Sequence, residues 1–418
     1  MMNLGKYSFG IGDRFSLQGE AQLAAIVKAQ KELGIKITPV WNKSNREHSI
    51  VHSDPSDARK EADAAVKALA FTGPYFVDAD HINLSNVDRF VDHSDFFTLD
   101  VADYIGKAAA PAEIEKFLAA TRKYVGSLSI PGIAHPFEVS EDYLKKFAAK
   151  FLNATLEAAK IYQHILAKKA AGKFVTEVSM DEVDEPQKPL DMLFILKSLA
   201  DLKVPAQTIA PKFTGRFNKG VDYQGNVEQF GKEFEEDMLV IDYAVKNFGL
   251  PADLKLSVHS GSDKFSIYPV MGRLIKKYDK GIHVKTAGTT WLEEVIGLSI
   301  SGDKGLDLAK GIYTTAFKRK DELCGPYAAV IDIKEDKLPA PEALAKWNGE
   351  EFSSALRHIP GSPKYNPSLR QLIHVGYKVA FERGAEFTDV LKANKKIVGG
   401  CVTENLYDRH ILRLFVVD

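Results

Sequence analysis

The segment Leu254–Lys264 has residue types that could do chemistry beside a bound ligand. Its first half alternates apolar and polar residues, which indicates a short buried strand. The following turn, His259-Ser260-Gly261-Ser262, is small and polar and leaves space beside the imidazole. A helical pattern then runs from Tyr268 to Tyr278. This order of elements is typical of a catalytic loop on an α/β scaffold, although a histidine that only hydrogen-bonds its own turn is the alternative.

Polar and charged side chains follow other apolar stretches of the chain in the same way. If the stretches are parallel strands of a barrel, their carboxyl ends meet around one mouth, and these side chains predict a site there. They are Asp13, Arg14, Asn42, Lys43, Asp78, Asp80, His81, Asp100, Glu177, Lys212, His259 and Lys285.

Three of these residues predict a metal site. We take His81, Glu177 and His259 as ligands, because imidazole and carboxylate donors without thiolate suit Mn²⁺, Co²⁺, Ni²⁺ or Zn²⁺. Neighbours in a strand point to opposite faces, so we expect at most one of Asp80 and His81 to face the site. Either could complete the ligand set. The alternative for Glu177 is an ion pair with Lys212 inside the barrel.

The remaining assignments concern acid/base chemistry and substrate binding. Asp80, Glu177 and Lys212 are predicted to be catalytic, and the predicted substrate-binding residues are Arg14, Lys43, Ser260 and Lys285. A pocket with both signs of charge suits a polyhydroxylated or carboxylated molecule. No Gly-rich phosphate loop is evident, which favours a sugar acid over a sugar phosphate.

A lysine at a strand end could instead form a Schiff base with a ketone and need no metal. That chemistry requires an uncharged amine, whereas neighbouring carboxylates hold a lysine in its charged form. We therefore expect Lys212 and Lys285 to bind substrate oxygens or balance negative charge.

Other titratable residues carry weaker expectations. The run Asp181–Glu185 is expected to be a solvated loop, with Asp181 and Glu182 close enough to the mouth to reach it. His358 and His374 lie in the C-terminal part, where a capping helix could bring one of them over the site. Surface or packing roles are expected for His93, His135 and His164.

Eight strand–helix units in series must position these residues. Their strands are too apolar for one solvated face, which argues for a parallel sheet covered by helices. We predict an α/β fold, a (β/α)₈ TIM-type barrel over residues 1–300, with a helical insertion (103–171, with a loop at 127–137) after the fourth strand. An open doubly wound sheet is the alternative, but no third glycine follows Gly10 and Gly12. The expected strands are 7–14, 36–43, 74–81, 96–100, 174–179, 207–213, 254–259 and 281–288.

Residues 301–418 are expected to form a mostly helical extension packed on the barrel. One extended piece is predicted at Tyr327–Ile333 and one amphipathic helix at Ser368–Glu382. The spacing of Leu369, Leu372 and Ile373 indicates that this helix packs against another surface.

Composition excludes several classes of function. Among 418 residues, 55 are Lys or Arg and 56 are Asp or Glu, so no strong field selects nucleic acid or an anionic membrane. Two cysteines cannot form a disulfide framework, and no apolar run reaches the ~20 residues of a membrane span. We expect a cytoplasmic protein with a small-molecule substrate, no nucleic-acid or membrane partner, and a composition compatible with a homo-oligomer.

The chain resembles the tagaturonate epimerase family along essentially its whole length. The resemblance rests on Tyr75-Phe-Val-Asp-Ala-Asp-His81, Thr176-Glu-Val-Ser179, Ala210-Pro-Lys-Phe-Thr-Gly215, Ser257-Val-His-Ser-Gly-Ser-Asp-Lys264-Phe and Lys285-Thr-Ala-Gly-Thr-Thr-Trp291. It implies a metal-dependent barrel enzyme that interconverts D-tagaturonate and D-fructuronate in hexuronate catabolism, some members also acting as tagatose 4-epimerases. Those substrates differ at a carbon that the ketone does not acidify, so we expect retro-aldol/aldol chemistry. The alternatives are a metal-dependent aldolase, a ketose/aldose isomerase acting on a sugar or sugar acid, and a non-catalytic sugar-acid-binding protein.

Overall fold

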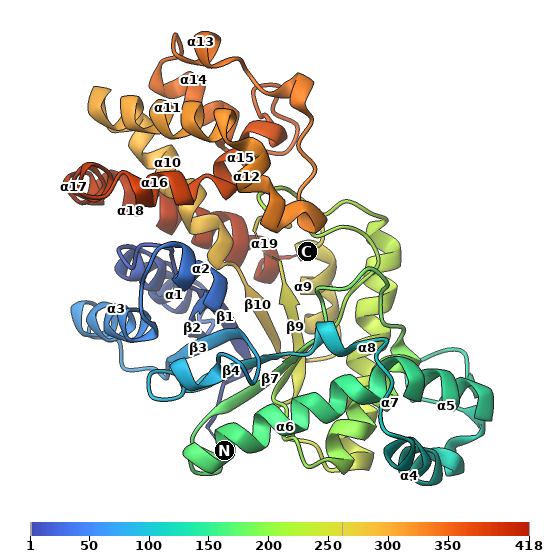
Figure 1. Cartoon of the computed structure of the whole chain (residues 1–418). Helices are drawn as coiled ribbons and strands as arrows, with labels where there is room; N and C mark the ends of the chain where they lie inside the picture. The colour runs from blue at the N-terminus through green and yellow to red at the C-terminus, as the bar shows by residue number, and fades with distance from the viewer. Residues whose placement is uncertain (1, 261, 418) are drawn as a thin grey trace.

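A closed barrel of parallel strands forms the centre of the molecule (Figure 1). The computed structural model describes residues 2–260 and 262–417, with the side chain of Ala287 excepted. Each strand pairs with its neighbours in chain order, and β1 closes the ring against β10 through the register Gly10↔Lys285. The strands are β1 (Tyr7–Ile11), β2 (Ile37–Ser44), β3 (Phe76–Ile82), β4 (Phe96–Asp100), β7 (Val175–Ser179), β8 (Thr208–Ala210), β9 (Lys255–His259) and β10 (Ile282–Lys285). The predicted TIM-type barrel is confirmed, and the open-sheet alternative is wrong.

Both faces of the strands are buried, which explains their nearly continuous apolar composition. All eight residues of β2 are buried, for example. Helices cover the outer face, and the principal ones are α1 (Gly19–Leu33), α3 (Pro55–Ala68), α6 (Asn153–Lys168), α7 (Pro189–Asp201), α8 (Val227–Phe248), α9 (Tyr268–Lys277) and α10 (Thr290–Ile300). Packing explains why residue 10 is a glycine. A Cβ there would lie 2.9 Å from Cγ of Lys285 and would displace that side chain.

The insertion between β4 and β7 is helical, as expected, but its predicted loop contains a small two-stranded sheet. It contains α4 (Pro111–Thr121), α5 (Glu141–Phe147) and a π-helical turn (Ala148–Leu152) that leads into α6. The ends of the predicted loop pair as two short antiparallel strands, β5 (Gly126–Leu128) and β6 (Phe137–Val139). These segments lie at one end of the molecule, away from the C-terminal helices (Figure 1).

Most of the C-terminal part is a layer of helices at the other end of the molecule, whereas its last helix lies against α9 of the barrel (Figure 1). It comprises α11 (Asp303–Lys318), α12 (Lys320–Cys324), α13 (Pro341–Leu344), α14 (Gly349–Leu356), α15 (Pro367–Val375), α16 (Tyr377–Glu382), α17 (Ala385–Ala393), α18 (Lys395–Glu404) and α19 (Leu412–Phe415). The prediction of an extended piece at 327–333 is wrong, because a 3₁₀ helix (Gly325–Val330) places Tyr327 against Tyr377, with their hydroxyls 2.8 Å apart. The predicted helix 368–382 is divided at Gly376.

Two large apolar cores and one small cluster inside the barrel form within the described residues, and the two large cores share elements. Trp291, Val295 and Leu298 of α10 pack with the C-terminal helices. In the opposite direction, Leu406 and Leu414 near the C-terminus pack into the barrel core. No helix within the described residues is long and apolar enough to cross a membrane.

Candidate active site

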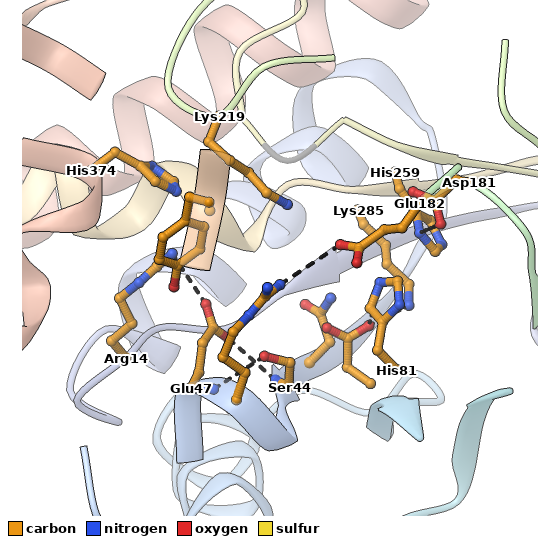
Figure 2. A pocket seen from close by; sticks show the side chains of 15 residues that line it. Arg14, Ser44, Glu47, His81, Asp181, Glu182, Lys219, His259, Lys285 and His374 are labelled. Atoms are coloured by element: carbon orange, nitrogen blue, oxygen red, sulfur yellow. Dashed lines mark hydrogen bonds and ion pairs between the residues drawn. The ribbon is translucent and has the colours of Figure 1, made fainter. Parts of the chain in front are cut away.

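A polar cavity opens at the carboxyl ends of the barrel strands, where the sequence predicts a site. Figure 2 shows its side chains converging from the barrel loops and from the C-terminal helices. It is lined by Arg14, Asn42, Ser44, Arg46, Glu47, Asp80, His81, Asp181, Glu182, Lys219, His259, Lys285, Gly288, Tyr327 and His374. Four basic side chains and four carboxylates therefore face the same space.

His81, Asp181 and His259 form a cluster on one side of this cavity that could hold a metal ion (Figure 2). One donor atom from each residue lies within 4.8 Å of the others, and His259 Nδ1 is 3.2 Å from Asp181 Oδ1. Two of these residues were predicted as ligands. Asp181 was expected only to lie near the mouth, because the run 181–185 has no distinctive spacing; the turn after β7 brings it inward.

Asp80 and His81 both face the cavity, so the expectation that only one of them would do so is wrong. The pairing of β3 with β4 shifts register between Ala79 and Ile82, and His81 has a φ of 52°. This left-handed conformation interrupts the alternation of side chains that a regular strand imposes. It is costly for a non-glycine residue, and such strain is concentrated at functional sites.

Glu177 lies next to the cluster and not in it. Its Oε1 is 2.7 Å from His259 Nε2, its Oε2 accepts a hydrogen bond from Thr208, and it is fully buried. His81 has a similar outer partner, because its Nδ1 is 3.3 Å from Asp100 Oδ2. Carboxylates that hold one nitrogen of an imidazole orient the other nitrogen toward a metal.

Lys285 is surrounded by carboxylates inside the barrel mouth. Its Nζ is 2.9 Å from Asp78, 2.7 Å from Asp80 and 3.0 Å from Glu177. Burial alone would lower the pKa of Lys285, but these carboxylates outweigh burial and raise it well above its usual range. Lys285 is therefore charged, as expected, and Glu177 pairs with it and not with Lys212.

Lys212 lies behind the cluster, in a small hollow that Asp181, His259 and Phe213 also line. Burial lowers the pKa of Lys212, and the nearby carboxylates do not reverse this direction. Burial therefore outweighs the carboxylates at Lys212, which lies beside the rings of Phe213 and Phe217, whereas the carboxylates outweigh burial at Lys285. The assignment of Lys212 to substrate binding stays a prediction.

Of the other predicted substrate-binding residues, only Arg14 lines the cavity directly. Its Nη2 is 3.1 Å from Glu47, and its guanidinium lies over the ring of Tyr377. Lys43 is buried beneath and donates to the carbonyl of Arg14 at 2.7 Å. Ser260 is also buried and donates to the carbonyl of Lys285. Gly261, the next residue in the chain, lies outside the described residues.

Sequence reasoning missed several lining residues. Ser44 and Glu47 form a capping box that starts α2 (Asn45–Ile50) directly after β2. The Ser-x-x-Glu spacing is visible in the sequence and could have located this strand end. Lys219 and Tyr327 have no such signal. Of His358 and His374, the two histidines that a capping helix could bring over the site, His374 lines the cavity, whereas His358 lies 3.4 Å from Asp263.

Comparison with known proteins identifies the family of the chain. The family model described as tagaturonate epimerase (UxaE) matches residues 1–410. The chain belongs to the tagaturonate epimerase family. It is thus an epimerase, an enzyme of the isomerase class.

One relative in sequence and two solved structures are similar to the chain. The chain is 28% identical over 382 residues to a tagaturonate/fructuronate epimerase of Thermotoga maritima, covering 88% of this chain and 72% of that protein. The fold matches the glycerol-complexed crystal structure of fructuronate-tagaturonate epimerase from Cohnella laeviribosi with a TM-score of 0.81, at 23% identity over 99% of this chain and 82% of that one. The native structure of that protein gives a TM-score of 0.78 at 22% identity and the same coverage.

Proposed function

We propose that this epimerase interconverts D-tagaturonate and D-fructuronate in a metal-dependent reaction that proceeds by retro-aldol cleavage and recombination. Membership of the tagaturonate epimerase family supports the substrates. The observation that carries the metal requirement is the convergence of His81, Asp181 and His259.

The chemistry of this donor set fits a divalent cation. His259 shares a hydrogen bond with Glu177 through Nε2, while its buried Nδ1 has no hydrogen-bond partner and faces a carboxylate oxygen of Asp181. If Nε2 carries the proton, the lone pair of His259 Nδ1 points at the carboxylate of Asp181, and the two repel each other. A cation between these two atoms would remove the repulsion. A divalent ion held there would act as a Lewis acid toward a substrate ketone.

Retro-aldol chemistry follows from the structures of the two sugar acids. They differ at the carbon beyond the ketone's neighbour, where simple proton exchange is slow. A base takes the hydroxyl proton of that carbon, the hydroxyl oxygen becomes an aldehyde, and the adjacent carbon–carbon bond breaks. Its electron pair moves to the ketone fragment as an enediolate. The aldehyde then turns and recombines through its other face, so no net oxidation occurs.

The barrel mouth contains groups suited to these steps. Burial alone would raise the pKa of Asp80, but Lys285 and His81 outweigh burial and lower it, so the carboxylate is ionised. Lys285, held charged at 2.7 Å from Asp80, balances the negative charge of the enediolate. We assign Asp80 as the base and Lys285 as the cation that stabilises the cleaved state.

Metal analysis of purified variants tests the proposal. We expect His259→Ala to lose bound divalent metal and at least 100-fold in activity, the order expected when a metal ligand is removed. Cooperative unfolding should be retained. His135→Ala, at an exposed histidine of the insertion, is the matched control and should keep both metal and activity.

Turnover of D-tagaturonate followed by NMR tests the reaction. D-Fructuronate as the product supports epimerisation, whereas accumulated three-carbon fragments would identify an aldolase and an aldose product a ketose/aldose isomerase. Full activity of thoroughly chelated, metal-free protein would contradict the metal requirement.

A further inference from the structure

Lys219 differs from the other basic residues of the cavity in its ion pairs. Arg14 is paired with Glu47, Arg46 lies 3.7 Å from Glu182, and Lys285 contacts three carboxylates. Within residues 2–260 and 262–417, no carboxylate lies within ion-pair distance of Lys219 Nζ. Its positive charge is therefore available to an anionic ligand, whereas carboxylates already neutralise the charges of Arg14, Arg46 and Lys285.

The position of Lys219 is set by the C-terminal helices. Its backbone N–H donates to the carbonyl of Val330 at 2.7 Å. The carbonyl of the next residue, Gly220, accepts a 2.6 Å hydrogen bond from Nε of Arg370, which is itself fully buried. These contacts fix the backbone at Lys219 before a ligand binds, so that binding has to order only the lysine side chain.

His374 lies beside Lys219 and adds a second polar group (Figure 2). It is 1% exposed, and its Nδ1 has no hydrogen-bond partner among the described residues. Burial lowers the pKa of His374 well below its usual range, and Arg14 and Lys219 act in the same direction. A neutral imidazole can donate one N–H to a ligand oxygen, and a buried polar group without a partner is costly unless a ligand satisfies it.

These two residues lie across the cavity from the His81–Asp181–His259 cluster (Figure 2). A ligand that spans the cavity therefore meets cation-binding donors at one end and an ammonium at the other. A hexuronate has the same polarity, with its ketone and diol near one end and its carboxylate at the other.

We propose that Lys219 binds the carboxylate of the sugar-acid substrate, with His374 beside it, and thereby makes this site prefer a uronate to the corresponding neutral ketose. This inference rests on the proposed function. D-Tagatose is the matched probe, because it has a hydroxymethyl group where D-tagaturonate has the carboxylate.

The test compares Lys219→Met with the wild type on both sugars. A charge-assisted hydrogen bond is lost, so we expect kcat/KM for D-tagaturonate to fall about 10- to 100-fold. The fall should come mainly through KM, because the carboxylate is bound equally before and during bond cleavage. The inhibition constant of D-tagatose against D-tagaturonate turnover should change less than about threefold, since no charged group of that sugar is involved.

Two further variants separate recognition from structure. Lys219→Arg keeps the charge and should restore most of the preference for the uronate. Lys334→Met removes an exposed lysine that pairs with Asp332 outside the cavity, and should leave both sugars unaffected.

The outcomes distinguish this inference from the proposed function. Equal weakening of both sugars by Lys219→Met, or unchanged kinetics with D-tagaturonate, overturns the role of Lys219 while the epimerase activity stands. A wild-type protein that does not convert D-tagaturonate at all overturns the proposed function itself.

Discussion

At the scale of single residues, metal binding depends on which nitrogen of each imidazole contacts a carboxylate. Glu177 shares a hydrogen bond with Nε2 of His259, and Asp100 lies beside Nδ1 of His81. Each histidine therefore has one nitrogen directed by a carboxylate of the scaffold. Asp181 has a different position, because its Oδ1 faces the free nitrogen of His259. The two acids, Glu177 and Asp181, should consequently contribute differently to metal binding.

Paired variants test this difference. Glu177→Gln keeps the shape and an acceptor oxygen near His259, so we expect metal affinity to fall about 10- to 100-fold, as for an outer-sphere partner. Asp181→Asn removes a charged ligand and should weaken binding further. Metal titration of both apo-proteins with Zn²⁺ or Mn²⁺ measures the two constants. A larger loss for Glu177→Gln would instead support Glu177 as the direct ligand.

At the scale of elements, α15 connects the C-terminal layer to the barrel mouth. Arg370 and His374 are one turn apart and lie on the same side of the helix. His374 faces the cavity, whereas Arg370 Nη2 binds Asp263, in the segment after β9, at 2.6 Å. Asp263 also contacts His410, so three distant segments meet at one buried carboxylate.

Removing Arg370 should therefore destabilise the whole enzyme. Arg370→Met leaves Asp263 buried without its main counter-charge, and the expected loss is about 3–5 kcal/mol in the free energy of unfolding. Urea unfolding measures it. Lys378→Met, which removes an exposed pair with Glu322, is the control and should cost about 0–1 kcal/mol. A similar, small loss for both variants would contradict the structural role of Asp263.

At the scale of the whole molecule, the two cores are interlocked. Barrel helix α10 packs in the C-terminal core, and the last residues of the chain return to the barrel core. The loop 214–226 contacts the C-terminal part through Val330 and Arg370. The division of the chain at residue 300 stays a prediction from the sequence.

Global stability should depend on pH through buried histidines such as His48. Burial lowers the pKa of His48 to about 4, whereas its unfolded value is about 6.5. Between these values the unfolded chain binds a proton that the folded chain does not, so stability falls as pH decreases from about 6.5 to about 4. Urea unfolding at several pH values should show that His48→Gln reduces this slope by about 1.4 kcal/mol per pH unit. An unchanged slope would contradict a neutral His48.

Much of the fold could be predicted because strand periodicity is a local property. Every barrel strand lies within or beside its predicted range, since apolar runs bounded by polar turns report burial on both faces. The piece at 327–333 was predicted wrongly because Tyr327 packs against Tyr377, a contact that no local pattern reports. The site was found in part for the same reason. His81 and His259 lie at the carboxyl ends of β3 and β9, whereas Lys219 lies in a loop placed by Val330 and Arg370.

The sequence by itself determined the barrel, the mouth at which the titratable residues gather, and the family through its motifs. Only the tertiary structure decided which of those residues share a ligand-binding space. The shifted register at His81 put two neighbouring side chains on one face, and the turn after β7 brought Asp181 to the imidazoles. The C-terminal helices placed Lys219 and His374 opposite the imidazole cluster. The physical reason is that periodicity fixes which face a side chain takes, while contacts between distant segments fix the distances on which binding and catalysis depend.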